Sequence, residues 1–142
     1  MVRKGDNMQK LYEAVVTSKG GRNGHIKTND GILDFAVAVP KEMGGEGGAT
    51  NPEQLFGAAY ASCFENALIH FANLHNIKLE DTSVTAFVAV LADDKGAFNL
   101  EVKLEVTLIG CDNPEKLVRI ADLACPYSKA VRNNIPVEIV IK

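Results

Sequence analysis

The sequence predicts an α+β fold in which antiparallel sheets wrap around one long central helix. Three observations support this class. Short segments rich in β-forming residues, separated by glycine and asparagine turns, come first. A nearly uncharged segment then begins at Asn51-Pro52 and carries apolar residues on almost every helical face to about residue 76. Two long strand-like segments, 79–91 and 97–109, follow, joined by an Asp-Asp-Lys-Gly sequence that suits a hairpin.

The part of the chain before the helix is predicted to form three short strands. Residues 10–18 are the first, and a Gly-Gly-Arg-Asn-Gly turn separates them from the second at 25–28. An Asn-Asp-Gly turn leads to the third strand at 32–39. Residues 41–49 are rich in glycine but lack the lysine and spacing of a phosphate-binding loop, so we interpret them as a flexible arm.

The central helix has two overlapping start signals. Thr50 and Glu53 have the spacing of a capping box, and Asn51 followed by Pro52 is a typical N-cap with proline at the first helical position. Both signals place the start of the helix within the same few residues.

A second helix is predicted to begin at Asn113-Pro114 and to break at Cys125. The residue before a proline is disfavoured in helical conformation, so Cys125 should lie at a junction between two helices. Pro126 then begins a shorter helix that reaches about Asn133, and a last strand covers 136–141.

Length and composition fit one domain over residues 1–142, with residues 1–9 as a flexible N-terminal segment. The net charge is −3 and cations do not cluster, so we expect neither a nucleic acid nor a membrane as partner. We expect no signal peptide, because the basic start leads into no apolar segment. The sequence has no apolar run of the ~18–20 residues that a membrane span requires. Its odd number of cysteines, without a secretory signal, favours a cytoplasmic location.

The three cysteines, Cys63, Cys111 and Cys125, are the residues best able to carry chemistry. The histidines are scattered and no metal-ligand motif is present, so no metal site is predicted. His70 follows Cys63 by seven residues, about 10 Å along a helix, which is too far for a proton acceptor. Pattern alone favours inert packing for Cys63 and Cys111, whereas the helix start after Cys125 favours its thiolate.

Four motifs, in the correct order, resemble one known family. "GGRNG", "PKEMGGEGGATNPEQLF", "YASCF" and "ACPYSKAVRNNIPV" are together similar to the OsmC/Ohr family, and specifically to its organic hydroperoxide resistance (Ohr) branch. The resemblance implies an intertwined homodimer whose central helices are enclosed by two curved sheets. It also implies a thiol-dependent peroxidase without metal or haem. Such an enzyme reduces organic hydroperoxides to alcohols, in response to oxidative stress, and is re-reduced by dihydrolipoyl groups.

The resemblance also assigns roles to four residues. It implies that Cys63 is the peroxidatic cysteine, that Cys125 is the resolving cysteine, and that Arg22 and Glu53 belong to the site. The chain departs from the family at Asp122, where members often carry His. Further departures are Glu65-Asn66, where less charged residues are usual, and a CPYSKAV sequence that blends two branches of the family. These differences bear on substrate preference and pH dependence.

A thiolate at Cys63 requires a nearby positive charge. Lowering a thiol pKa of ~8.5 by about 3 units takes roughly 4 kcal/mol. The helix dipole is not felt that far into a helix, and apolar surroundings raise the pKa. One guanidinium at about 4 Å supplies about 4 kcal/mol at an effective dielectric near 20. Pattern alone makes Arg22 a solvated turn residue, but with the resemblance we expect it to stabilise the thiolate.

Glu53 is then expected to orient Arg22 through a bidentate contact. Glu53 and Cys63 are ten residues apart, about 15 Å along a helix and on different faces. We therefore expect Arg22 and Glu53 to come from the other subunit.

The expected reaction has three steps. The Cys63 thiolate attacks the peroxide, Cys125 captures the sulfenic acid as a disulfide, and a small dithiol reopens it. Leu55, Phe56 and Phe64 are expected to form an apolar pocket that favours alkyl or lipid peroxides over hydrogen peroxide. Two alternatives stay open. They are a cysteine hydrolase or acyl-transfer enzyme, which needs a base near Cys63, and a non-catalytic dimeric redox-sensing or binding protein.

Overall fold

The computed structural model describes residues 7–142, which form two compact units. The first unit ends at Asn51 and the second covers Pro52–Lys142. Residues 1–6, part of the N-terminal segment expected to be flexible, lie outside the described residues.

The first unit contains a small antiparallel sheet. Its strands are β1 (Val16–Lys19), β2 (His25–Thr28) and β3 (Asp34–Ala36), in that order. The turn between β1 and β2 holds a short 3-10 helix, η1 (Gly21–Asn23), and begins at Gly20 with a φ of 88° that glycine adopts without strain. A second 3-10 helix, η2 (Lys41–Met43), lies in the predicted flexible arm.

The first and third strands are shorter than predicted. Residues 10–15, which we expected in the first strand, are exposed and lie outside it. β1 pairs only with β2, residue for residue from Val16 to Lys19, so the four residues of β2 limit its length. The third strand covers three residues instead of the eight between 32 and 39.

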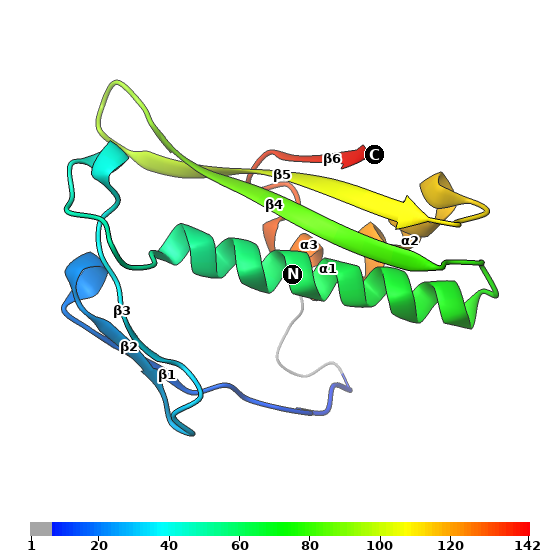
Figure 1. Cartoon of the computed structure of the whole chain (residues 1–142), viewed down its shortest axis with the longest axis horizontal. Helices are drawn as coiled ribbons and strands as arrows, with labels where there is room; N and C mark the ends of the chain where they lie inside the picture. The colour runs from blue at the N-terminus through cyan, green and yellow to red at the C-terminus, as the bar shows by residue number, and fades with distance from the viewer. Residues whose placement is uncertain (1–6) are drawn as a thin grey trace. The chain divides into compact units, whose positions relative to one another are not determined.

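The second unit places one long helix along a three-stranded sheet (Figure 1). The helix is α1 (Pro52–Leu74); the strands are β4 (Asp81–Ala92), β5 (Phe98–Ile109) and β6 (Val137–Ile141). Two further helices, α2 (Pro114–Ala124) and α3 (Pro126–Val131), connect β5 to β6 and contact α1. The predicted order of a central helix, two strands, a broken helix and a final strand is confirmed.

One part of the fold prediction is wrong. We expected antiparallel pairing, which β4 and β5 show, but β6 pairs with β5 in parallel, with Val137 opposite Val102. The chain travels from the end of β5 to the start of β6 through α2 and α3. A crossover of that length permits the parallel direction, whereas a short hairpin turn imposes the antiparallel one.

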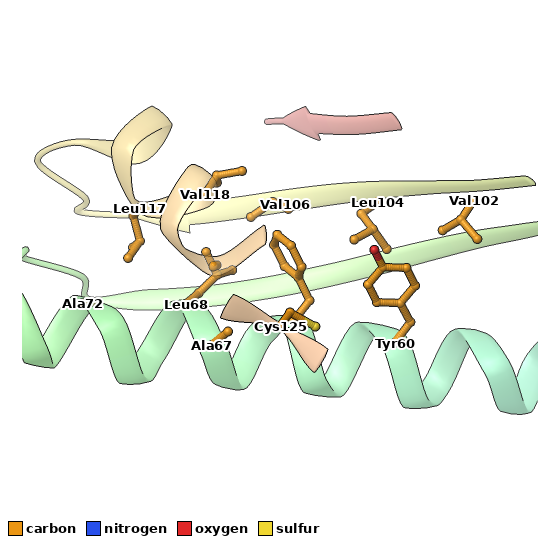
Figure 2. Close-up of a cluster of buried hydrophobic side chains, with 12 residues drawn as sticks. Tyr60, Ala67, Leu68, Ala72, Val102, Leu104, Val106, Leu117, Val118 and Cys125 are labelled. Atoms are coloured by element: carbon orange, nitrogen blue, oxygen red, sulfur yellow. The ribbon is translucent and has the colours of Figure 1, made fainter. Parts of the chain in front are cut away.

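The core lies between α1, the inner face of β5 and the α2–α3 segment (Figure 2). Its fully buried side chains include Tyr60, Phe64, Leu68, Val102, Leu104, Val106, Leu117, Ala121 and Cys125. Buried positions alternate along β5 and recur every three or four residues on α1, as expected for a strand and a helix that each bury one face.

The opposite side of α1 is exposed in the single chain, at Ser62, Asn66 and Ile69 among others. Within the second unit, the sheet and the two shorter helices therefore cover α1 on one side only. Among residues 7–142, the structure contains no helix with both the length and the apolar character that a membrane crossing requires.

Candidate functional site

Cys63 lies on α1 at the edge of the core. Tyr60, three residues earlier, and Ala67, four residues later, are both buried. Side chains at these spacings share one side of a helix, so the Cys63 side chain borders the core. It is half-buried and packs against the core cluster.

Cys125 is the junction between α2 and α3. Its N–H donates to the carbonyl of Ala121 (2.8 Å) and its carbonyl accepts from the N–H of Lys129 (3.0 Å), so it belongs to both helices. Its ψ of 122° is not helical, as expected before a proline. The side chain is fully buried and lies beside α1 (Figure 2). The predicted helix break is confirmed.

The structure places the free thiols of Cys63 and Cys125 close enough to interact electrostatically. Burial raises the pKa of Cys63, and the interaction with the neighbouring Cys125 raises it further. The N–H of Tyr127 lowers the pKa, because it lies in the first turn of α3 and lacks an intrahelical partner. Within the described chain these effects together raise the pKa of Cys63 and favour its protonated form. This is the direction that we predicted for apolar surroundings.

Arg22 and Glu53 lie in different units. Arg22 is an exposed residue of η1, and Glu53 is half-buried in the first turn of α1. Ten residues of continuous helix, a rise of about 15 Å, separate Glu53 from Cys63. α1 alone therefore does not place this carboxylate beside the sulfur, and the roles of both residues stay predictions.

The three apolar candidates for the substrate pocket lie on α1. Leu55 and Phe56 are half-buried, and the Phe56 ring meets Tyr60 edge to face at 6.3 Å. Phe64 is fully buried and its ring also meets Tyr60 edge to face, at 6.5 Å. Phe64 therefore forms part of the core next to Cys63, while Leu55 and Phe56 keep exposed surface. Their contact with a substrate stays a prediction.

Sequence reasoning did not identify a set of polar contacts around Cys125. The Tyr60 hydroxyl and Ser128 Oγ lie 2.8 Å apart, both buried. Burial raises the pKa of Tyr60, so its hydroxyl stays protonated. Arg132 Nη2 donates to the Asp122 carbonyl (2.6 Å) and lies 3.2 Å from the Asp122 carboxylate. The sequence shows Asp122 only as a departure from the histidine common in the family.

Within the described part of the chain, no group of three or more His, Cys, Asp or Glu side chains could hold a metal ion. His25 pairs with Asp34 in the first sheet. His70 and His75 each contact the ring of Phe71.

The fold and the thiol pair together define a small α+β protein with two interacting free cysteines. The OsmC-like protein family model matches residues 45–140. Organic hydroperoxide resistance protein OhrB of Bacillus subtilis is 43% identical, over 93% of this chain and 98% of its own length. The organic hydroperoxide resistance protein of Xanthomonas axonopodis pv. citri is 40% identical, over 92% of this chain and 94% of its own length.

Solved structures agree with these matches. An organic hydroperoxide resistance protein OsmC from Legionella pneumophila, 46% identical, superposes with a TM-score of 0.90 and covers 94% of this chain and 99% of its own. The B. subtilis OhrB structure, 41% identical, gives 0.85 and covers 94% and 100%. This chain belongs to the OsmC-like family, in its organic hydroperoxide resistance branch.

Proposed function

We propose that this protein reduces organic hydroperoxides to alcohols through Cys63 and Cys125. The observation that carries the proposal is the proximity of these two free thiols, which interact electrostatically. One is half-buried at the edge of the core on α1, and the other is buried at a helix junction. The names of the relatives at 40–43% identity, organic hydroperoxide resistance proteins, support the substrate class.

The reaction proceeds by two successive attacks at sulfur. The Cys63 thiolate attacks the distal oxygen of the hydroperoxide, the O–O bond breaks, and the alkoxide leaves as alcohol after taking a proton. Cys63 is thereby oxidised by two electrons to sulfenic acid. The Cys125 sulfur attacks the sulfenic sulfur, the S–O bond breaks, and water leaves with formation of a disulfide. A dihydrolipoyl group or another small dithiol then reduces this disulfide by exchange and is itself oxidised to a disulfide.

The thiolate of Cys63 depends on a positive charge from outside its immediate surroundings. Among residues 7–142, burial and the neighbouring thiol raise the pKa of Cys63, and the Tyr127 N–H opposes them. We assign the missing charge to Arg22, oriented by Glu53, contributed by a second copy of the chain. The side of α1 left exposed at Ser62, Asn66 and Ile69 supports a homodimer, because a second copy can cover it.

The substrate preference follows from the apolar residues of α1. Leu55 and Phe56 keep exposed apolar surface near the start of α1, and Phe64 forms the core beside Cys63. Apolar surface gains free energy by removing an alkyl chain from water, at about 25 cal/mol per Å². Hydrogen peroxide offers no such surface, so alkyl and lipid hydroperoxides are the preferred substrates.

Treating the reduced protein with one equivalent of cumene hydroperoxide is expected to consume two thiols. Mass-spectrometric mapping should find a Cys63–Cys125 disulfide and a free Cys111, because Cys125 is the thiol that interacts with Cys63. Hydrogen peroxide at the same concentration serves as the control and should react more slowly. Loss of a single thiol, or a disulfide that includes Cys111, would contradict the proposed mechanism.

We expect the protein to turn over with dihydrolipoamide as electron donor, and much more slowly with thioredoxin. The reason is steric: Cys125 is fully buried, so a small dithiol reaches the disulfide more readily than a folded protein does. Steady-state consumption of t-butyl hydroperoxide with each donor measures the difference. A protein that forms the disulfide but turns over with neither donor would instead be a redox sensor, and faster turnover with thioredoxin would reject the assignment of the reductant.

A further inference from the structure

We propose that two polar contacts, Arg132 with Asp122 and Tyr60 with Ser128, position Cys125 for attack on oxidised Cys63. These four residues are called the junction clamp below. The proposal rests on the proposed function and deepens it, because it assigns positioning residues to the step in which the disulfide closes.

The backbone alone holds Cys125 weakly. Cys125 is a single non-helical residue between α2 and α3, fixed by one hydrogen bond on each side. α3 has only six residues, and helices this short are marginal without tertiary contacts. Contacts from outside the junction therefore add to core packing in setting the direction in which the Cys125 sulfur points.

The first contact, between Arg132 and Asp122, replaces a backbone hydrogen bond that Pro126 cannot make. The carbonyl of Asp122 would accept a hydrogen bond from the residue four positions later in a continuous helix. That residue is Pro126, which has no N–H. Arg132, directly after the last residue of α3, supplies the missing donor at 2.6 Å and also pairs with the Asp122 carboxylate at 3.2 Å. One side chain therefore links the last turn of α2 to the end of α3 across the break.

The second contact fixes α3 to α1 one helical turn from the thiols. Tyr60 precedes Cys63 by three residues on α1, and Ser128 follows Cys125 by three. At this spacing Tyr60 and Cys63 lie on the same side of α1. The 2.8 Å Tyr60–Ser128 hydrogen bond therefore joins α3 to the side of α1 that carries Cys63, about one helical turn before it. Tyr127 adds a stacked ring contact with Tyr60 at 6.3 Å.

Close packing does not replace these contacts. Tyr60, Asp122, Ser128 and Arg132 line a cavity of about 170 Å³, whose other walls include residues of β6. α3 therefore has room on this side to shift when the clamp is lost. A shift would change the direction of attack by Cys125 and leave Cys63 on its rigid helix.

The test separates the two chemical steps in the full-length protein. Arg132→Ala and Tyr60→Phe are expected to slow disulfide closure about tenfold after a pulse of cumene hydroperoxide, the scale of one lost hydrogen bond. Formation of the Cys63 sulfenic acid, trapped with dimedone, should stay within about twofold of the unmodified protein. Sulfinic acid at Cys63 should accumulate at high peroxide, because the sulfenic acid survives longer. Arg132→Lys, which keeps one donor for the Asp122 carbonyl, should recover part of the closure rate.

Arg119→Ala is the matched control, since Arg119 is an exposed arginine of α2. It should leave both steps unchanged. Equal slowing of sulfenic acid formation and closure in the clamp variants would show a general structural effect and overturn the proposal. An unchanged closure rate in both variants, with the melting temperature retained, would also overturn it.

Tyr60 is fully buried, so the folding of Tyr60→Phe needs a separate check. The Arg132 side chain is 35% exposed, so Arg132→Ala tests the proposal independently of any folding defect in Tyr60→Phe. Failure of the proposed function gives a different result. In that case the unmodified protein itself forms no Cys63–Cys125 disulfide.

Discussion

Replacing Cys63 with serine is expected to abolish hydroperoxide reduction, with kcat/KM falling at least about a thousandfold. A serine hydroxyl is not ionised near neutral pH, and its oxygen cannot pass through the sulfenic acid that the mechanism requires. Steady-state consumption of t-butyl hydroperoxide with dihydrolipoamide measures the loss. The variant should keep its fold, because Cys63 is only half-buried and a serine side chain is only slightly smaller than a cysteine side chain.

The other two cysteines provide matched controls for this prediction. Cys125→Ser should still release one equivalent of alcohol in the first turnover and then accumulate the sulfenic acid of Cys63. Cys111→Ser should behave like the unmodified protein, because Cys125, and not Cys111, is the thiol that interacts with Cys63. Turnover by Cys63→Ser comparable to that of Cys111→Ser would refute the role of Cys63.

Local sequence signals predicted the elements that local physics decides. The proline after Cys125 forces a non-helical backbone at the preceding residue, so the break between α2 and α3 could be predicted from two residues. The start of α1 followed from Pro52 and the polar residues before it. The direction of β6 could not be predicted in this way. It depends on how α2 and α3 carry the chain back to β5, which is a property of tertiary packing.

The residues of the candidate site also differ in how far the sequence could predict them. Family motifs predicted roles for Cys63 and Cys125, and the structure places these two thiols close enough to interact. The contact of Tyr60 with Ser128 joins residues 68 positions apart, and no local pattern connects them. Arg132 lies ten positions after Asp122, beyond the three- or four-residue spacing of helical pairs, and donates to a carbonyl that Pro126 leaves without a partner. Such contacts become visible only when both helices are placed.

Replacing Arg22 with glutamine is expected to lower kcat/KM at about pH 7 by up to a thousandfold. A guanidinium about 4 Å from the sulfur contributes about 4 kcal/mol to the thiolate, which corresponds to about 3 pKa units. Without it, burial and the neighbouring Cys125 raise the pKa of Cys63, and protonated thiol prevails at neutral pH. Because only the thiolate attacks, kcat/KM of the variant should rise as the pH increases towards this raised pKa. The unmodified protein should reach its plateau at lower pH.

Mixed dimers then decide which chain supplies the arginine. A dimer of one Cys63→Ser chain and one Arg22→Gln chain contains a single Cys63 and a single Arg22, on different chains. If Arg22 acts across the dimer, that Cys63 meets an intact Arg22 and co-expression restores activity that neither variant has alone. If Arg22 acts within its own chain, the only Cys63 faces glutamine and the mixed dimer stays as inactive as Arg22→Gln. Purification of the mixed dimer through different tags on the two chains gives the measurement. We expect a second copy to contribute because about 15 Å of helix separates Glu53 from Cys63. An inactive mixed dimer would refute a shared site.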